Sequence, residues 1–156
     1  MIKVDIPGRS GFELKYAVFD FNGTMATDGI LDKSCIEKMK LLAEKVDVYI
    51  LSSDTYGTVQ KQCEDLPVKV MVMSKDNGST DKMNFVNELG SQNTVCIGNG
   101  SNDSKMFEIA AFSIIIMGDE GCSKKALLNS DVLVRNINDG LDLLLDNSRI
   151  IATLRE

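Results

Sequence analysis

The hydrophobic and polar positions of this chain follow two alternating periods. Runs of consecutive apolar residues are typical of strands buried on both faces of a sheet. They predict strands at 16–19, 46–51, 68–72, 94–97, 112–116 and 131–134. Between them, apolar residues recur at helical spacing and predict helices near 57–65, 79–89, 102–110, 123–129 and 137–145, and a further helix capped by Ser34. This alternation predicts a three-layer α/β fold, with a parallel sheet covered by helices on both faces.

The N-terminal residues follow a different pattern. Two short alternating stretches, 2–6 and 12–15, flank a turn-rich segment at 7–11 and predict a β-hairpin. The chain has 156 residues, and domains commonly take roughly 100–200. We therefore expect a single domain over 1–156, with the hairpin at 1–15, the core at 16–134 and a helical tail at 135–156.

Composition and charge narrow the class of partner. Hydrophobic residues make up 44% and charged residues 26%, an ordinary mixture for a globular protein. The chain carries 17 basic and 23 acidic residues with no basic cluster, which argues against nucleic acid as a partner. No apolar run approaches the ~20 residues that a membrane-spanning helix needs. With no pattern of a signal peptide after Met1, the expected location is the cytoplasm.

The reactive side chains limit the chemistry. There is no histidine, which excludes Ser-His-Asp and Cys-His nucleophiles and histidine-ligated metals. The four cysteines are widely spaced without a CxxC pair, so buried thiols in a reducing compartment are expected. Catalysis would therefore use carboxylates, amides, hydroxyls, lysines and a hard metal ion.

Three small polar segments follow predicted strands at their carboxyl ends. They are 20–24 (DFNGT), 52–54 (SSD) and 98–103 (GNGSND). In parallel sheets of this kind, ligands bind outside the carboxyl ends of the strands, near the point where the strand order reverses. We therefore expect the three segments to converge on one site.

These segments carry a resemblance to a known family. The run 18–24 (VFDFNGT) resembles the first motif, hhDxDGT, of the haloacid dehalogenase-type (HAD) phosphotransferases. The run 51–54 is similar to their second motif, Lys82 matches the lysine of the third by position, and 97–103 (IGNGSND) resembles the fourth, GDGxND. Four motifs in order span about 16–134, and the soluble P-type ATPase-like branch is the most similar. The resemblance implies a Rossmann-like HAD fold.

The resemblance also implies roles for individual residues, and these suit the chemistry of the side chains. Asp20 would attack phosphorus and form an aspartyl-phosphate, while Lys82 supplies positive charge beside it. A Mg²⁺ cofactor would be held by oxygens of Asp20, the Asn22 carbonyl, Asn99 and Asp103. The predicted phosphate-binding residues are Gly23, Thr24, Ser52 and Ser53.

Two positions depart from the family pattern. Asn22 stands where phosphatases of the family have an aspartic acid that acts as general acid and base, and an amide cannot move a proton in this way. Loss of such a group typically costs about 10²–10⁴-fold in rate. Asn99 replaces the metal-binding aspartate of the fourth motif. We therefore expect a slow Mg²⁺-dependent phosphohydrolase. The alternatives are a catalytically weak or silent phosphate-binding or regulatory module, and a domain that accepts phosphate from a donor and signals.

The spacing of the motifs bears on the substrate. Only about nine residues separate Thr24 from Ser34, which leaves space for a small flap hairpin but for no cap domain. An uncapped site either admits a large phosphorylated substrate or is covered by a second subunit. A homo-oligomer is therefore one hypothesis. Alternative roles remain open for several residues: a turn cap for Asp20, a helix cap for Asp54 and Asp103, and a solvated surface position for Lys82.

Overall fold

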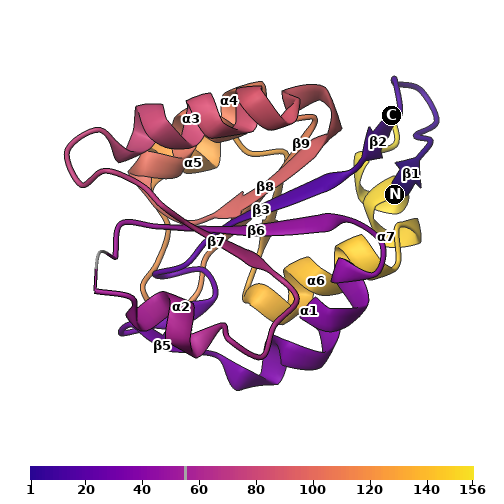
Figure 1. Ribbon diagram of the computed structural model, residues 1–156. Coiled ribbons are helices and arrows are strands. Elements are labelled where there is room, and N and C mark those ends of the chain that lie inside the picture. Colours follow the sequence, from indigo (N-terminus) through magenta and orange to yellow (C-terminus); the bar gives the residue numbers. More distant parts are fainter. Residues whose placement is uncertain (55) are drawn as a thin grey trace.

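The central feature of the computed structural model, which describes residues 1–54 and 56–156, is a parallel sheet (Figure 1). Its six strands are β3 (Tyr16–Asp20), β6 (Asp47–Ser52), β7 (Lys69–Val72), β8 (Thr94–Gly98), β9 (Phe112–Ile116) and β10 (Val132–Val134). The order across the sheet is β10-β9-β8-β3-β6-β7, and each neighbouring pair is parallel. The α/β fold and the positions of all six predicted strands are confirmed.

Helices cover both faces of the sheet, as its apolar strands require (Figure 1). One face carries α3 (Gly78–Leu89), α4 (Ser104–Ile109) and α5 (Lys124–Leu128), and the other carries α1 (Ile36–Ala43) and α6 (Ile137–Leu145). Successive residues of a strand point to opposite faces. Val18 accordingly packs in the cluster with α3, α4 and α5, while Phe19 packs in the larger cluster on the other face. Both side chains are fully buried.

The strand order reverses between β3 and β8. From β3 the chain moves outward through β6 to β7, then crosses back to β8 on the other side of β3 and continues to β9 and β10. Adjacent loops therefore leave the sheet in opposite directions at this point, which opens a crevice outside the carboxyl ends. Asp20 ends β3 and Asn99 directly follows β8, so the reversal brings the two predicted site segments together.

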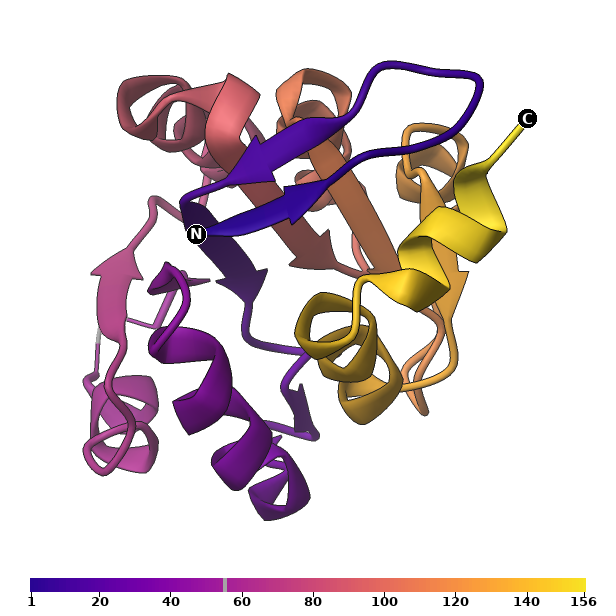
Figure 2. The ribbon, with the colours of Figure 1, turned by 90° about the vertical axis from the view of Figure 1, so that its right-hand side faces the viewer.

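The predicted N-terminal hairpin is confirmed. Strands β1 (Ile2–Val4) and β2 (Phe12–Leu14) pair antiparallel and lead directly into β3. Figure 2 shows this hairpin in front of the sheet, with the C-terminal helix α7 (Ser148–Leu154) near it. The Asn147 side chain donates to the carbonyl of Lys3 over 2.6 Å. The hairpin therefore covers the end of the sheet opposite Asp20.

The segment between Asp20 and α1 contains a small flap. Strands β4 (Ala26–Thr27) and β5 (Ile30–Leu31) pair antiparallel, and α2 (Thr58–Gln62) holds β5 through hydrogen bonds of Gln62 with Leu31 and Gly29. A short 3₁₀ turn, Lys33–Cys35, then leads into α1. The prediction that Ser34 caps this helix is wrong, because the N-cap of α1 is Cys35. Ser34 lies within the 3₁₀ turn, which Asp32 caps by accepting hydrogen bonds from both the amide and the hydroxyl of Ser34.

None of the helices in the described parts of the chain is long and apolar enough to cross a membrane.

Candidate active site

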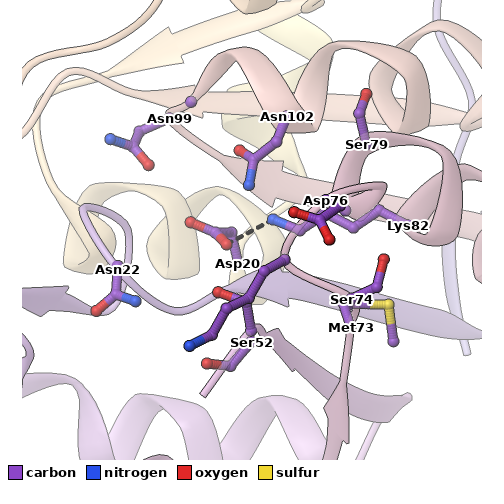
Figure 3. A pocket seen from close by; sticks show the side chains of 14 residues that line it. Asp20, Asn22, Ser52, Met73, Ser74, Asp76, Ser79, Lys82, Asn99 and Asn102 are labelled. Carbon is purple, nitrogen blue, oxygen red and sulfur yellow. Dashed lines mark hydrogen bonds and ion pairs between the residues drawn. The ribbon is translucent and has the colours of Figure 1, made fainter. Parts of the chain in front are cut away.

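A cavity of about 440 Å³ opens at the carboxyl ends of β3, β6, β7 and β8 (Figure 3). Its walls come from four loops that are far apart in the sequence. The lining residues are Asp20, Asn22, Ser52, Ser53, Met73, Ser74, Lys75, Asp76, Gly78, Ser79, Lys82, Asn99, Gly100 and Asn102. Residues from all four resembling motifs therefore meet in one pocket, as the strand order predicts.

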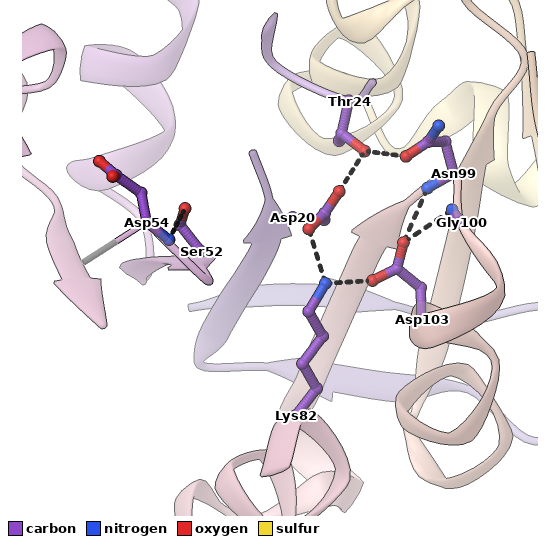
Figure 4. Close-up of polar contacts among 8 residues, drawn as sticks. All are labelled: Asp20, Thr24, Ser52, Asp54, Lys82, Asn99, Gly100 and Asp103. Atoms are coloured by element: carbon purple, nitrogen blue, oxygen red, sulfur yellow. Dashed lines mark hydrogen bonds and ion pairs between the residues drawn. The ribbon is translucent and has the colours of Figure 1, made fainter. Parts of the chain in front are cut away.

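A buried lysine joins two carboxylates beside this cavity (Figure 4). The Nζ of Lys82, on α3, donates to Oδ1 of Asp20 and to Oδ1 of Asp103, each over 2.6 Å. Lys82 is only 2% exposed and Asp103 is fully buried. Lys82 is therefore not a solvated surface lysine, and Asp20 is not a turn cap. All three side chains are buried at the edge of the cavity, so their charges are poorly screened by water.

Burial changes the proton affinity of this group. Burial raises the pKa of Asp20, the Asp103 carboxylate raises it further, and Lys82 lowers it, which leaves the pKa of Asp20 at about 7. For Lys82, burial lowers the pKa, but Asp20 and Asp103 raise it by more, so the net pKa lies above the usual value of lysine. The ammonium of Lys82 is therefore a permanent charge at neutral pH, whereas Asp20 is not fully ionised without a further cation.

Asp103 joins Lys82 to the loop after β8. Its Oδ1 accepts from Lys82, and its Oδ2 accepts from the backbone amides of Asn99 and Gly100 over 3.0 and 2.9 Å. A side chain at Gly98 would clash with this carboxylate, which shows how tightly the loop closes over it. Asp103 therefore holds Lys82 and this loop in place, and its binding of a metal stays a prediction.

Hard oxygen atoms for a metal ion come from the other predicted residues. The hydroxyl of Thr24 donates to Oδ2 of Asp20 over 3.4 Å and to Oδ1 of Asn99 over 3.3 Å, so these two oxygens converge. The Nδ2 of Asn99 donates to the carbonyl of Gly121 over 3.1 Å, which fixes Oδ1 toward Asp20. With the carbonyl of Asn22, this set suits Mg²⁺ that keeps several waters. Within the described residues, no three His, Cys, Asp or Glu side chains form a metal cluster.

Gly23 and Thr24 lie behind Asp20 instead of on the pocket wall. Gly23 has a φ of +75°, and a side chain there would clash with Asn99. Both residues line a separate hollow of about 230 Å³, and Thr24 is only 5% exposed. The turn after β3 therefore places both residues outside the lining of the main cavity, where Thr24 contacts Asp20 and Asn99. Their contact with phosphate stays a prediction.

Ser52 and Ser53 do line the cavity, as predicted for phosphate-binding residues. The Oγ of Ser52 accepts from the amide of Asp54 over 3.1 Å (Figure 4). This bond uses a lone pair, so the hydroxyl proton of Ser52 remains available to a ligand. The Asp54 carboxylate accepts from the amides of Tyr56 and Val59 and so binds the first turn of α2, although the N-cap of that helix is Gly57 and not Asp54 as considered.

One wall of the cavity was missed by the sequence interpretation. It is formed by the loop after β7, by the start of α3 and by one residue after β8: Ser74, Lys75, Asp76, Gly78, Ser79 and Asn102. The first turn of α3 faces the cavity, and helix N-termini favour anions. A signal was present in the sequence, because the polar run 74–80 (SKDNGST) follows a strand at the same edge of the sheet.

Asn99 provides a test of the metal site. We expect Asn99→Asp to lower the half-saturating Mg²⁺ concentration by about tenfold, because an added charge beside Asp20 attracts a divalent cation. The same change loses the hydrogen bond to Gly121, so apo-protein stability should fall slightly. Mg²⁺ titration of thermal stability measures both effects. Asn102→Asp, which adds the same charge elsewhere on the wall, is the control, and equal shifts for both variants would contradict the assignment.

The chain is similar in sequence to proteins of an archaeon. No family model matches the chain. It is 42% identical over 79 residues to the uncharacterized protein MJ0073 of Methanocaldococcus jannaschii, a match that covers 48% of this chain and 85% of that protein. It is 25% identical over 123 residues to a soluble P-type ATPase-like phosphatase of the same organism, covering 77% of this chain and 45% of that protein.

Solved structures share the fold over most of its length. The cobalt-bound deoxy-D-mannose-octulosonate 8-phosphate phosphatase of Haemophilus influenzae has a TM-score of 0.73 at 17% identity and covers 92% of this chain and 94% of its own. The corresponding phosphatase of Moraxella catarrhalis, in complex with magnesium, phosphate and sugar, gives 0.71 at 18% identity, with 91% and 94% covered.

A third structure carries the family name. A putative HAD superfamily hydrolase of Legionella pneumophila has a TM-score of 0.67 at 15% identity and covers 90% of this chain and 86% of its own. These likenesses confirm the expected Rossmann-like HAD fold. The chain therefore belongs to one family with MJ0073, and its fold is that of the haloacid dehalogenase superfamily.

Proposed function

We propose that this protein is a Mg²⁺-dependent phosphohydrolase that works through an aspartyl-phosphate on Asp20. The observation that carries the proposal is the contact of Asp20 with buried Lys82 at the floor of an open polar cavity. A carboxylate held there by a fixed ammonium is oriented toward a phosphoryl group, and the ammonium offsets charge that develops on transfer.

Residues of the chain act in both half-reactions of the proposed mechanism. The Asp20 carboxylate attacks phosphorus, the bond from phosphorus to the leaving oxygen breaks, and Ser52 and the first turn of α3 bind the phosphoryl oxygens. Water then attacks the phosphorus of phospho-Asp20 and releases phosphate. Thr24 and Asp103 hold the geometry of Asp20, Asn99 and Lys82 throughout. Bound Mg²⁺ supplies neutralising charge to the phosphoryl oxygens.

The relatives support this proposal without fixing its substrate. One of them is named a phosphatase, and the Moraxella catarrhalis structure holds magnesium and phosphate. Between Asp20 and α1 this chain has only the small flap of β4 and β5, so the cavity stays open to solvent. We extend the proposal to the substrate, a phosphate monoester or an acyl phosphate in which the group attached to phosphate can be large. A second copy of the chain that covers the site is a further hypothesis.

The test is a rapid-quench experiment with the wild-type chain. With Mg²⁺, p-nitrophenyl phosphate and acetyl phosphate should each give a burst of product close to one equivalent, an acid-stable phosphoprotein and slow turnover afterwards. With EDTA, both signals should disappear. Binding of beryllofluoride without any turnover across the substrate panel would instead favour a phosphate-binding module and would overturn the proposal.

Asn22 explains why turnover should be slow. Its exposed amide lines the cavity but cannot give or take a proton. We expect Asn22→Asp to raise kcat by about tenfold or more, because a positioned acid and base typically contributes about 10²–10⁴-fold in an optimised site. The phosphoprotein fraction at steady state should fall in parallel. Asn102→Asp controls for the added charge, and an unchanged or lower kcat in Asn22→Asp would contradict this explanation.

A further inference from the structure

We infer that the preferred substrates of this site are acyl phosphates, in which the group that leaves phosphorus is a carboxylate. This inference rests on the proposed function and narrows its substrate class. An alkoxide or phenoxide needs a proton as it departs, whereas a carboxylate is a stable anion at neutral pH. The side chains around Asp20 therefore decide which leaving groups the site can release.

Lys82 is held on the wrong side of phosphorus to protonate a leaving oxygen. Its Nζ lies 2.6 Å from Oδ1 of Asp20, the carboxylate that attacks, and 2.6 Å from Oδ1 of Asp103. In phosphoryl transfer the attacking and leaving oxygens lie roughly in line through phosphorus. A lysine bonded to the attacking carboxylate therefore stays on the side of attack, where it offsets charge but delivers no proton to the leaving group.

The other side chains at the strand ends are amides and a hydroxyl. Asn22 is exposed and lines the cavity, and Figure 3 draws Asn22 and Lys82 on opposite sides of Asp20. Asn99 and Ser52 line the same cavity. Amides and aliphatic hydroxyls donate hydrogen bonds but do not give up their protons at neutral pH. These residues can hold phosphoryl oxygens or a substrate carbonyl, but they cannot protonate an alkoxide.

The two charged residues of the outer wall, Lys75 and Asp76, are both exposed. The Nζ of Lys75 lies 5.8 Å from the centre of the Tyr56 ring, and Tyr56 is 85% exposed, so this ammonium lies at the rim of the molecule. An exposed carboxyl group is ionised at neutral pH and has no proton to give. The described lining therefore suits a leaving group that departs as an anion.

The first half-reaction balances without a proton for an acyl phosphate. The Asp20 carboxylate bonds to phosphorus, the bond from phosphorus to the acyl oxygen breaks, and its electron pair stays on the departing carboxylate. One carboxyl phosphate is thus exchanged for another, with the same type of bond broken and formed. A phosphate monoester would instead release an alkoxide into a site that supplies it no proton.

The second half-reaction is a reaction of the same class, because phospho-Asp20 is itself an acyl phosphate. The oxygen of water bonds to phosphorus, both protons of the water remain with the phosphate, and Asp20 departs as a carboxylate. The products are dihydrogen phosphate and ionised Asp20, so this step also needs no proton for the leaving group. Water attacks without a base, which agrees with slow release of phosphate and with rapid formation of phospho-Asp20 from an acyl phosphate.

The test compares acetyl phosphate, p-nitrophenyl phosphate and phenyl phosphate in Mg²⁺, in order of increasing basicity of the leaving oxygen. We expect kcat/KM, which reports formation of phospho-Asp20, to be at least about 10²-fold higher for acetyl phosphate than for phenyl phosphate. In Asn22→Asp, which supplies a carboxyl group as proton donor, phenyl phosphate should gain about 10²-fold and acetyl phosphate less than about threefold. The ratio of the two substrates should therefore contract.

The controls separate this inference from the proposed function. Asp20→Asn is the blank for spontaneous hydrolysis of acetyl phosphate, and Asn102→Asp adds the same charge elsewhere on the wall and should leave the ratio unchanged. If wild type hydrolyses none of the three substrates faster than the blank, the proposed function and the substrate class are both overturned. If hydrolysis depends on Asp20 but the wild-type ratio is smaller than expected, or contracts equally in Asn102→Asp, or does not contract in Asn22→Asp, only the substrate class is overturned.

Discussion

Replacing Asp20 by asparagine is expected to lower hydrolysis of p-nitrophenyl phosphate by about 10³-fold or more and to abolish the phosphoprotein. Removal of a nucleophile commonly leaves only the residual rate supplied by binding and electrostatics. The amide of Asn keeps the shape of the side chain and can still contact Lys82 and Thr24. Steady-state kinetics and acid-stable labelling measure the loss. Retention of label in Asp20→Asn would place the phosphoryl group on another residue.

The same substitution should not unfold the protein, which makes the activity loss interpretable. The pKa of Asp20 is about 7 in the folded chain, whereas the ordinary pKa of an aspartic acid, which we take for the unfolded chain, is 3.8. The folded carboxyl therefore holds its proton more tightly, and its favourable contribution to stability is lost as pH rises from 3.8 to about 7. In EDTA, wild type should lose stability over this range, while Asp20→Asn should lose less. Urea unfolding at pH 5 and pH 8 measures this loss of unfolding free energy in both proteins. If Asp20→Asn were less stable than wild type at pH 8, the prediction would be contradicted.

Lys82→Met is expected to destabilise the fold by about 3–5 kcal/mol, the cost of removing one partner from a buried ion pair. The aliphatic part of the side chain is retained, but Asp20 and Asp103 would face each other without the ammonium that both now accept from. Denaturant unfolding at pH 8 measures the loss. Phosphoprotein formation should fall as well, because Lys82 no longer fixes Asp20.

Two further variants complete this test. Lys125→Met changes an exposed lysine of α5 and should alter stability by less than about 0.5 kcal/mol. Combining Lys82→Met with Asp103→Asn should recover part of the stability, since one of the two unpaired charges is removed. A loss below about 1 kcal/mol in Lys82→Met, measured at pH 8, would show that the ion pairs are not a major support of the fold.

The sheet and the place of the site could be predicted because strand burial leaves a strong pattern. Strands such as β8 and β9 are buried at every position, so they appear as continuous apolar runs. Polar residues directly after such runs must lie at the same edge of a parallel sheet. Asp20, Ser52 and Asn99 therefore meet as predicted, although the three belong to segments distant in the sequence.

The directions of individual side chains could not be predicted from spacing. A single 3₁₀ turn, Ser101–Asp103, folds Asp103 back onto the amides of Asn99 and Gly100 and away from the cavity. The positive φ of Gly23 likewise turns Thr24 behind Asp20. Both outcomes depend on backbone angles within one turn. The cavity wall after β7 was missed for another reason, because this loop corresponds to no motif and only its position at the edge of the sheet brings it to the cavity.

Strand β7 lies at the edge of the sheet and pairs with β6 alone. Its outward amides have no neighbouring strand, and Val72 is 57% exposed. Local opening costs least where backbone hydrogen bonds face solvent and few apolar contacts hold a segment. Amide deuterium exchange should therefore be faster in β7 than in β3. The cavity wall formed by the loop after β7 is thus attached to an edge strand, whereas Asp20 lies on β3, which is paired on both sides, so local opening of β7 leaves the pairing of β3 with β8 intact.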